Sequence, residues 1–230
     1  MDKLPFSVYD FFAYLSSGAV IVAAGDYVFR FGLLTQRDIA PVLAVELVVV
    51  AYVFGHVVAH FSSWFFEQVA VGRFLGRPAS ILLGAPPRWR LLPWIFPNYF
   101  RPLPAPTRER VNVQARNRGC ASSGEALFLH AYATLTGCSE KAQARLDDFR
   151  NQYGFARNMS FAFLISAMAI VVGHRVNPAL ETRWAACAGV VGVALFYRYL
   201  KFFRQYSYDL LLRYAELAQP GSTNSPHGGA

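Results

Sequence analysis

Four apolar stretches separated by polar segments dominate the chain, at residues 11–25, 47–66, 159–173 and 184–197. A helix needs about 20 mostly apolar residues to cross the hydrocarbon core of a bilayer. The second stretch has 20 residues, whereas the other three have 14 or 15 and reach that length only with flanking residues. Arginine and lysine stems beside these ends can lie along apolar surface while the charge reaches the interface. The pattern predicts four transmembrane helices; two spans plus buried or interfacial helices is the alternative.

The composition supports a membrane protein. Hydrophobic residues make up 54% of the 230 residues and charged residues 16%, against about 25% charged residues in an average soluble domain. This balance argues against a disordered chain and against an ordinary soluble enzyme. We therefore expect an all-α, polytopic membrane protein with four transmembrane helices and a helical cytoplasmic segment between the second and third.

The distribution of positive charge predicts the orientation. Close to the spans, twelve lysines and arginines fall on the side of the two termini and the central segment, and four fall on the other side. Basic residues near spans are retained in the cytoplasm. Both termini and the central segment are thus expected to be cytoplasmic, in a bacterial inner membrane.

The central segment, residues 73–157, holds 13 lysines and arginines and 5 aspartates and glutamates. Nucleic acid is not expected as its partner, because the chain has no nucleic-acid motif and topology already explains the charge. Anionic lipid of the inner leaflet is the simpler partner. Eight of the 13 prolines lie in residues 78–106, so we expect irregular structure there. Its candidate headgroup contacts are Arg88, Trp89, Arg90, Trp94 and Arg101; packing of this loop on the protein's own surface is an equal alternative.

Helix signals follow the proline-rich stretch. Residues 125–135 predict one helix, and Ser139 is expected to cap a second that runs without a break from about Glu140 to Gly173. The second span is expected to extend through residues 67–75 and the fourth through residues 206–217. The predicted division is two spans in residues 1–75, a basic cytoplasmic segment in 76–150, two spans in 151–217 and a disordered tail in 218–230.

Polar residues mark one side of the second apolar stretch. His56 and His60 are four residues apart and share a helix face. At 100° per residue, Glu46 and Glu67 fall in the same stripe, about 80° wide. Ionisable groups inside a membrane indicate function by default, so a proton or ion path is one interpretation. A stripe satisfied by hydrogen bonds from other helices is another, and a metal site is a third. Glu46 and His60 are about 21 Å apart along the axis and cannot share one ion.

Asp26 is the other intramembrane carboxylate. Because the first span runs outward and the second returns, Asp26 and Glu46 are both expected in the outer third of the membrane. Either can pair with Arg30, Arg37 or Arg175, or meet water at the interface.

Small residues on the fourth span form two pairs spaced four apart, Ala185 with Gly189 and Ala188 with Gly192. This spacing permits close approach of helices. We expect packing within the chain; a seam between copies in a homo-oligomer is the alternative.

Cysteine chemistry is not expected. Cys120, His130 and Cys138 have no zinc-ligand spacing, so the two cysteines are interpreted as isolated buried thiols. We expect no metal and no cofactor.

The stretch Tyr9-Asp10-Phe11-Phe12-Ala13-Tyr14-Leu15-Ser16-Ser17-Gly18 resembles the start of many small uncharacterised bacterial inner-membrane proteins. The stretch Tyr153-Gly154-Phe155-Ala156-Arg157-Asn158 before the third span is similar in style. The resemblance covers only these two stretches. It implies a bacterial inner-membrane location and carries no chemistry with it.

No nucleotide-binding, hydrolase or metalloprotease motif occurs in the sequence, and five histidines are too few for the multi-histidine site of membrane desaturases. The sequence favours a non-enzymatic protein that docks a partner or signals through its basic cytoplasmic segment. A co-encoded protein and a second copy are the candidate partners. The alternative function is an ion- or proton-coupled channel or permease that uses the polar stripe, and an enzyme comes third.

Overall fold

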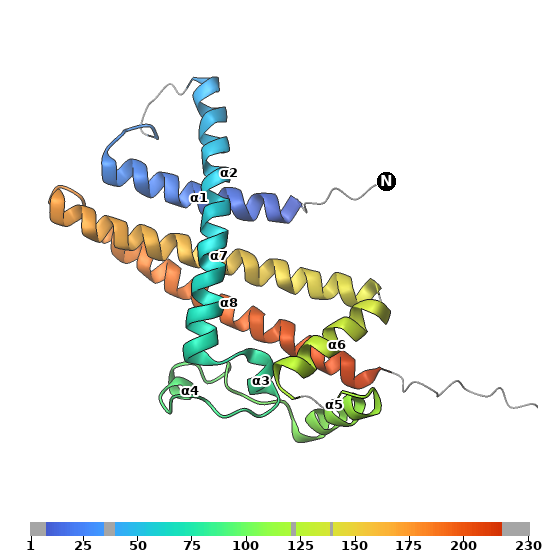
Figure 1. Ribbon diagram of the computed structural model, residues 1–230. Helices are drawn as coiled ribbons and strands as arrows, with labels where there is room; N and C mark the ends of the chain where they lie inside the picture. Colours follow the sequence, from blue (N-terminus) through green and yellow to red (C-terminus); the bar gives the residue numbers. More distant parts are fainter. Residues whose placement is uncertain (1–7, 35–39, 121–122, 139, 218–230) are drawn as a thin grey trace, which may run out of the picture. The chain divides into compact units, whose positions relative to one another are not determined.

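The structure, a computed structural model, describes residues 8–34, 40–120, 123–138 and 140–217. The described chain is helical and contains no strand, which confirms the all-α fold class. The predicted cap at Ser139 and the predicted disordered tail lie outside these residues. The helices, labelled in Figure 1, are α1 (Val8–Phe29), α2 (Pro41–Ser63), η1 (Trp64–Leu75), α3 (Pro78–Leu82), α4 (Leu92–Ile95), α5 (Ala105–Asn117), α6 (Glu125–Cys138), α7 (Glu140–Val176) and α8 (Thr182–Glu216).

Within the described residues, four helical stretches are long and apolar enough to cross a membrane, as the sequence predicts. They are Phe11–Phe29, Pro41–Leu82, Gln143–Val176 and Thr182–Glu216. Three of the apolar runs are shorter than 20 residues, and each gains the missing length from its flanks because the helix continues through them. The chain is a multi-pass membrane protein.

Two compact units divide the chain. One comprises Met1–Phe74 and Phe149–Phe203 and is called the apolar unit below; the other comprises Leu75–Asp148 and Arg204–Ala230 and is called the basic unit. The end of α8, predicted as part of the same division as the fourth span, belongs to the basic unit. Each unit is thus assembled from two separate parts of the sequence.

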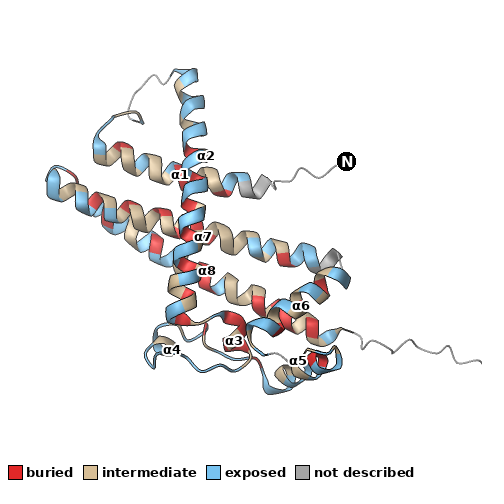
Figure 2. Cartoon of the chain, in the orientation of Figure 1, coloured by how far each residue is buried: buried red, intermediate tan, exposed pale blue. Residues whose placement is uncertain are grey.

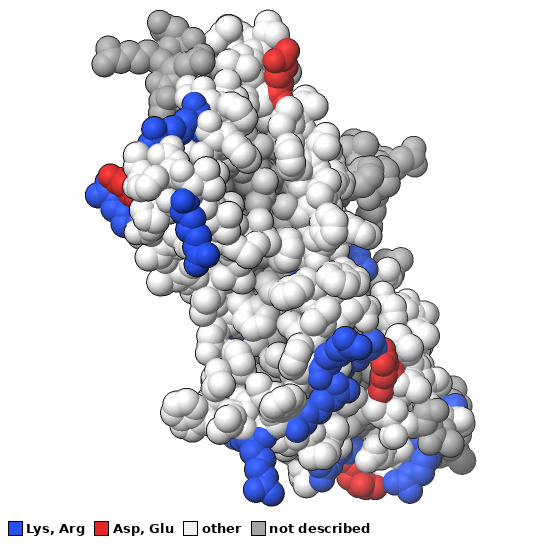
Figure 3. All heavy atoms as spheres, turned by 60° about the vertical axis from the view of Figure 1, so that its left-hand side comes forward, with Lys and Arg blue, Asp and Glu red and all other residues white. Residues whose placement is uncertain are grey.

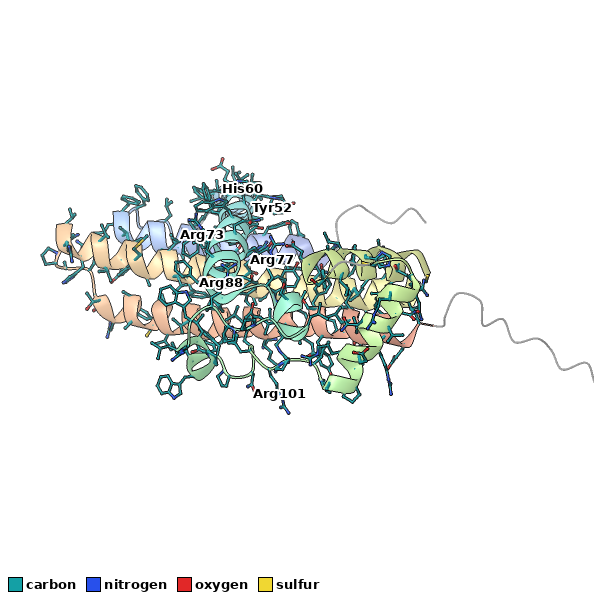
Figure 4. The ribbon with its side chains drawn as sticks, turned by 60° about the horizontal axis from the view of Figure 1, so that its bottom comes forward. Tyr52, His60, Arg73, Arg77, Arg88 and Arg101 are labelled. Carbon is teal, nitrogen blue, oxygen red and sulfur yellow. The ribbon has the colours of Figure 1, made fainter. Side chains whose placement is uncertain are left out.

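In the apolar unit, α1, α7 and α8 run side by side and α2 runs across them (Figures 1 and 4). Along its length, α2 with η1 meets α1 at Gly55, α7 at Ser62 and α8 at Phe66. A helix that meets its neighbours only at crossings leaves the surface between them uncovered. Figure 2 shows this as short buried patches on an otherwise exposed α2.

The helix type changes at Trp64. The predicted extension of the second span is present, but residues Trp64–Leu75 form a π-helix, η1, instead of continuing α2. π-Helical segments are rare in proteins, and those that occur are often found at functional sites. A π-turn holds more residues than an α-turn, so the constant 100° per residue used to place Glu67 on the polar stripe does not hold beyond Ser63.

The basic unit is built around its own core. Eleven buried residues from α3, α5, α6, the start of α7, the end of α8 and the loop before α5 form one cluster. They are Leu82, Leu103, Val111, Ala115, Leu127, Ala131, Leu135, Leu146, Leu210, Leu211 and Tyr214. Since burying apolar area is the main favourable contribution to folding, this cluster holds the basic unit together.

The expectation that residues 78–106 are wholly irregular is wrong. Helices α3, α4 and α5 each have a proline at one of their first two positions. Proline is well tolerated there because the first backbone N–H groups have no partner within the helix. The prolines therefore start these helices as well as limiting their length. Helix α5 was not predicted, although Val111 and Ala115 have the four-residue spacing of a buried helix face.

The other helix predictions agree with the structure. Helix α6 begins at Glu125 and α7 runs without a break from Glu140 to Val176, so the third span has the predicted continuous extension. The fourth span continues to Glu216.

Candidate functional site

A cluster of four polar side chains lies inside the apolar unit, between the α2–η1 junction and α7. The Ser62 hydroxyl donates a hydrogen bond of 2.7 Å to the amide oxygen Oδ1 of Asn158. Arg157 donates to the same oxygen from Nε and from Nη2, both at 3.2 Å. Its Nη1 forms an ion pair with the Glu67 carboxylate.

The cluster is largely removed from solvent. Ser62 and Asn158 are buried, and the side chains of Arg157 and Glu67 are 14% and 30% exposed. An unpaired charge in such a place costs several kcal/mol. The arrangement avoids this cost because each charged group has a partner of opposite charge or a hydrogen-bond partner.

Aromatic residues pack beside the cluster. Phe66 is buried, and its ring centroid lies 5.9 Å from that of Phe161, 5.0 Å from that of Phe196 and 5.7 Å from that of Tyr199. These contacts join η1, α7 and α8. A buried bond of 2.8 Å from the Ser160 hydroxyl to the Gly192 carbonyl adds a polar link between α7 and α8. The ion pair therefore lies next to tight packing that fixes its geometry.

The structure separates the four residues of the predicted polar stripe. Glu67 belongs to the cluster just described, whereas Glu46, His56 and His60 are exposed. The His56 ring stacks on Tyr14 of α1 with centroids 4.2 Å apart and meets the edge of Tyr52 at 4.7 Å. Figure 4 labels Tyr52 and His60 on α2. Asn158 and Arg157, which complete the buried cluster, were not predicted as site residues; their signal was an arginine and an asparagine at the start of an apolar stretch.

Asp26 is a turn-forming residue. Its carboxylate accepts hydrogen bonds from the backbone N–H groups of Leu33 at 2.8 Å and Leu34 at 3.2 Å. The expected pairing with Arg30 or Arg175 is replaced by these two bonds in the described structure, and Arg37 lies outside it. Asp26 is only 8% exposed. Its carboxylate holds the backbone that follows α1 through these two hydrogen bonds.

Small residues permit two close helix contacts. A Cβ added to Gly192 of α8 would lie 2.8 Å from the Leu164 side chain, so this glycine packs on α7 within the chain. At Gly189 the nearest atom beyond its own helix would be 4.0 Å away. Ala185 is buried and Ala188 half-buried. The closest contact, at Gly18 of α1 and Gly55 of α2, was not predicted from the sequence.

A Cβ on Gly18 would overlap the Ala51 carbonyl oxygen, and one on Gly55 would overlap the Tyr14 carbonyl oxygen. The backbones of α1 and α2 therefore touch where they cross. Only glycine permits this approach, since every other residue carries a Cβ.

The proline-rich stretch has a fixed base and an exposed tip. At the base, Tyr99 is buried and its hydroxyl donates a 2.8 Å bond to the Gly76 carbonyl. Burial raises the pKa of this phenol above its ordinary value. At the tip, Trp89 is 59% exposed and Trp94 is 85% exposed, so packing of the tryptophans on the protein's own surface is not what the structure shows. Arg88, Arg90 and Arg101 are exposed as well.

The thiols do not form a site. Cys120 is half-buried and Cys138 is exposed, so the expectation of a buried thiol is wrong for Cys138. It lies at the last position of α6, where the helix ends. Among the described residues, no group of three or more histidine, cysteine, aspartate or glutamate side chains is placed to hold a metal ion.

The geometry gives the buried cluster a role in joining helices. Its carboxylate, guanidinium, amide and hydroxyl groups bind one another and tie η1 to α7. Among the residues whose exposure the structure describes, the basic unit exposes seven arginines (Arg77, Arg88, Arg90, Arg101, Arg110, Arg116 and Arg145) and four acidic residues (Glu109, Glu125, Asp148 and Glu216). Comparison of the chain with protein-family models, curated proteins and solved structures finds no match.

Proposed function

We propose that the protein is a non-enzymatic adaptor of the bacterial inner membrane, with both termini in the cytoplasm, that docks an acidic protein partner on its basic unit. The observation that carries the proposal is a concentration of charge on a folded surface. Residues 77–118 contain eight arginines and a single acidic residue, Glu109. Six of these arginines are exposed, and two of the six form ion pairs, Arg77 with Glu125 and Arg116 with Glu109. Figure 3 shows Lys and Arg side chains gathered in groups on one face, with more Lys and Arg than acidic side chains in these groups.

Helix α5 supplies a preformed part of this surface. Val111, Gln114 and Ala115 bury one face of α5, and Gln114 Nε2 donates a 3.1 Å bond to the Leu217 carbonyl after α8. The exposed side of α5 carries Arg110 and Val113 beside the ion pair of Glu109 with Arg116. A rigid helix face with an exposed cation and an apolar side chain suits an acidic, partly apolar partner, because a charged rim steers association and an apolar centre adds affinity.

The spans give this surface an anchor. Helices α7 and α8 each contribute residues to the apolar unit and to the basic unit without a helix break. The cluster at Glu67 and Arg157 ties α7 to the helix that leads into the basic unit. This arrangement suits a protein that holds a partner at the membrane or passes a signal to it.

Site-specific photocrosslinking in cells tests the docking role. A photoreactive residue at Val113, which is 39% exposed, is expected to form a crosslink to one protein, whereas the same residue at the buried Val111 is not. Arg110→Gln, introduced beside the Val113 probe, is expected to weaken that crosslink severalfold. Arg183→Gln, at an exposed arginine of the apolar unit, is the charge-matched control and is expected to leave it unchanged. No crosslink from Val113 under any growth condition would contradict the proposal.

A further inference from the structure

The exposed tip of the proline-rich stretch is an apolar feature of the basic unit that the docking role does not use. Over seven residues, four large apolar side chains face outward: Trp89 is 59% exposed, Leu91 73%, Trp94 85% and Ile95 43%. Exposed apolar groups at this density mark an interaction site rather than ordinary surface. The short helix α4 carries two of them, and these residues, 89–95, are called the tryptophan tip below.

Basic residues surround the tip, and acidic residues are absent from this part of the sequence. Arg88 and Arg90 flank Trp89, and residues 77–108 contain five arginines and no aspartate or glutamate. Arg88 and Arg101 are labelled in Figure 4. Tryptophan favours the membrane interface because its ring is apolar and its N–H is polar. Arginine beside it favours anionic headgroups.

The base of the stretch holds the tip in a defined place. Tyr99 bonds to the Gly76 carbonyl, and the Leu103 backbone N–H donates a 3.0 Å bond to the Leu82 carbonyl. Leu82 and Leu103 both belong to the core of the basic unit. The exposed tryptophans therefore project from an ordered segment, so little conformational entropy remains to be lost when they bind.

We propose that the tryptophan tip inserts into the headgroup region of the anionic bilayer in which the spans reside, as a second membrane anchor. Trp89, Leu91 and Trp94 enter the interface and Arg88 and Arg90 contact lipid phosphates. The occupant is lipid rather than protein, because exposed tryptophans flanked by arginines, in a stretch of sequence without aspartate or glutamate, match the headgroup region in both polarity and charge. The inference shares Arg88 and Arg90 with the basic surface of the docking proposal but does not use Arg110 and Val113 of α5, and the choice of leaflet rests on the proposed orientation.

Tryptophan fluorescence of the full chain in proteoliposomes tests this anchor. The chain has four tryptophans, so Trp64→Phe with Trp184→Phe leaves the two tryptophans of the tip. Further single changes, Trp89→Phe or Trp94→Phe, isolate one at a time. Each variant is reconstituted with phospholipids brominated near the headgroup or deep in the acyl chain. Iodide in the aqueous phase is the second quencher and reports tryptophans that face water. The matched control variant keeps only Trp64, an exposed residue of the apolar unit.

The expected result is strong quenching of Trp89 and Trp94 by shallow bromolipid and weak quenching by iodide. Quenching by shallow bromolipid is expected to fall in neutral liposomes and with Arg88→Gln and Arg90→Gln, which lower the inserted-to-free ratio by about fivefold for each charge. Iodide quenching without bromolipid quenching would overturn the proposal. Protection from both quenchers would also overturn it, since it would mean that protein covers the tip.

Discussion

Arg157 on α7 pairs with Glu67 on η1, ninety residues earlier in the chain, while two other nitrogens of the same guanidinium donate to the neighbouring Asn158. One side chain thereby organises both the ion pair and the hydrogen bond from Ser62. The position of Glu67 depends on the π-helix, because the extra residue per turn resets which side chains face α7. The helix irregularity and the ion pair are parts of one arrangement.

Arg157→Gln is expected to lower the free energy of unfolding by about 1–3 kcal/mol, because it leaves the Glu67 carboxylate partly buried without its counter-ion. Reversible unfolding in mixed micelles measures the change. Arg183→Gln breaks the exposed pair with Glu181 and is expected to cost about 0–1 kcal/mol. A double variant with Glu67→Gln completes the cycle, and additive costs would show that the two residues are not coupled.

Gly18→Ala is expected to destabilise the protein by about 1–3 kcal/mol, because the added methyl overlaps the Ala51 carbonyl oxygen and must push α1 and α2 apart. Gly25→Ala, on the same helix, is the matched control. A Cβ there meets nothing within 4 Å, and alanine favours helix by about 0.5–1 kcal/mol over glycine. Equal thermal stability of the two variants in detergent would contradict the close contact.

The apolar pattern was enough to predict the helical class and the extent of α7 and α8, because a long run without proline or glycine clusters has one favourable local structure. The pattern was not enough for α2. Its change to a π-helix was not predicted, and its path across the other helices depends on contacts such as Gly18 with Ala51, which join residues far apart in sequence.

The candidate site shows the same limit. His56 and His60 stand out in sequence because histidine is rare in an apolar run, yet the structure places them on the surface of the unit. Arg157 and Asn158 look like ordinary polar residues before a span, and only the fold brings them against Ser62 and Glu67. The polarity of these residues indicated that they resist burial in lipid. It did not indicate which of them contact one another in the fold.

Tyr99→Phe is expected to reduce the decrease in folding stability that the protein shows at high pH. Burial raises the pKa of the Tyr99 phenol in the folded state, whereas in the unfolded chain it ionises near 10. Above that pH the unfolded chain releases the proton first, so folding stability falls as pH rises. The phenylalanine variant is expected to show a smaller decrease above about pH 10, with a cost of about 0.5–1.5 kcal/mol at neutral pH from the lost bond to Gly76. An identical alkaline decrease in both proteins would contradict the assignment.

Reporter fusions test the proposed orientation. The excess of basic residues beside the termini and the central segment predicts cytoplasmic signals from fusions after Arg118 and at the C-terminus. Fusions at Thr35 and Pro178 are expected to give periplasmic signals. A periplasmic signal at Arg118 would reverse the topology on which the docking proposal rests.

Ion flux distinguishes the adaptor from the permease. Because Glu46, His56 and His60 are exposed and lie apart from the Glu67–Arg157 cluster, proteoliposomes are expected to show no flux above empty liposomes between about pH 5 and 8, the range in which histidine changes charge. His56→Ala is then expected to change stability only slightly, through loss of the contact with Tyr14. A pH-dependent flux that His56→Ala abolishes would favour the permease instead.

The division of each unit between two parts of the sequence sets an order of events during synthesis. The core of the basic unit requires Leu210, Leu211 and Tyr214 from the end of α8, in addition to residues 82–146. A ribosome therefore completes the sequence of the first two spans and the whole central segment long before that core can close. Until the last helix emerges, α5 and α6 have no α8 to pack against, so folding of the basic unit waits for synthesis of the end of the fourth span.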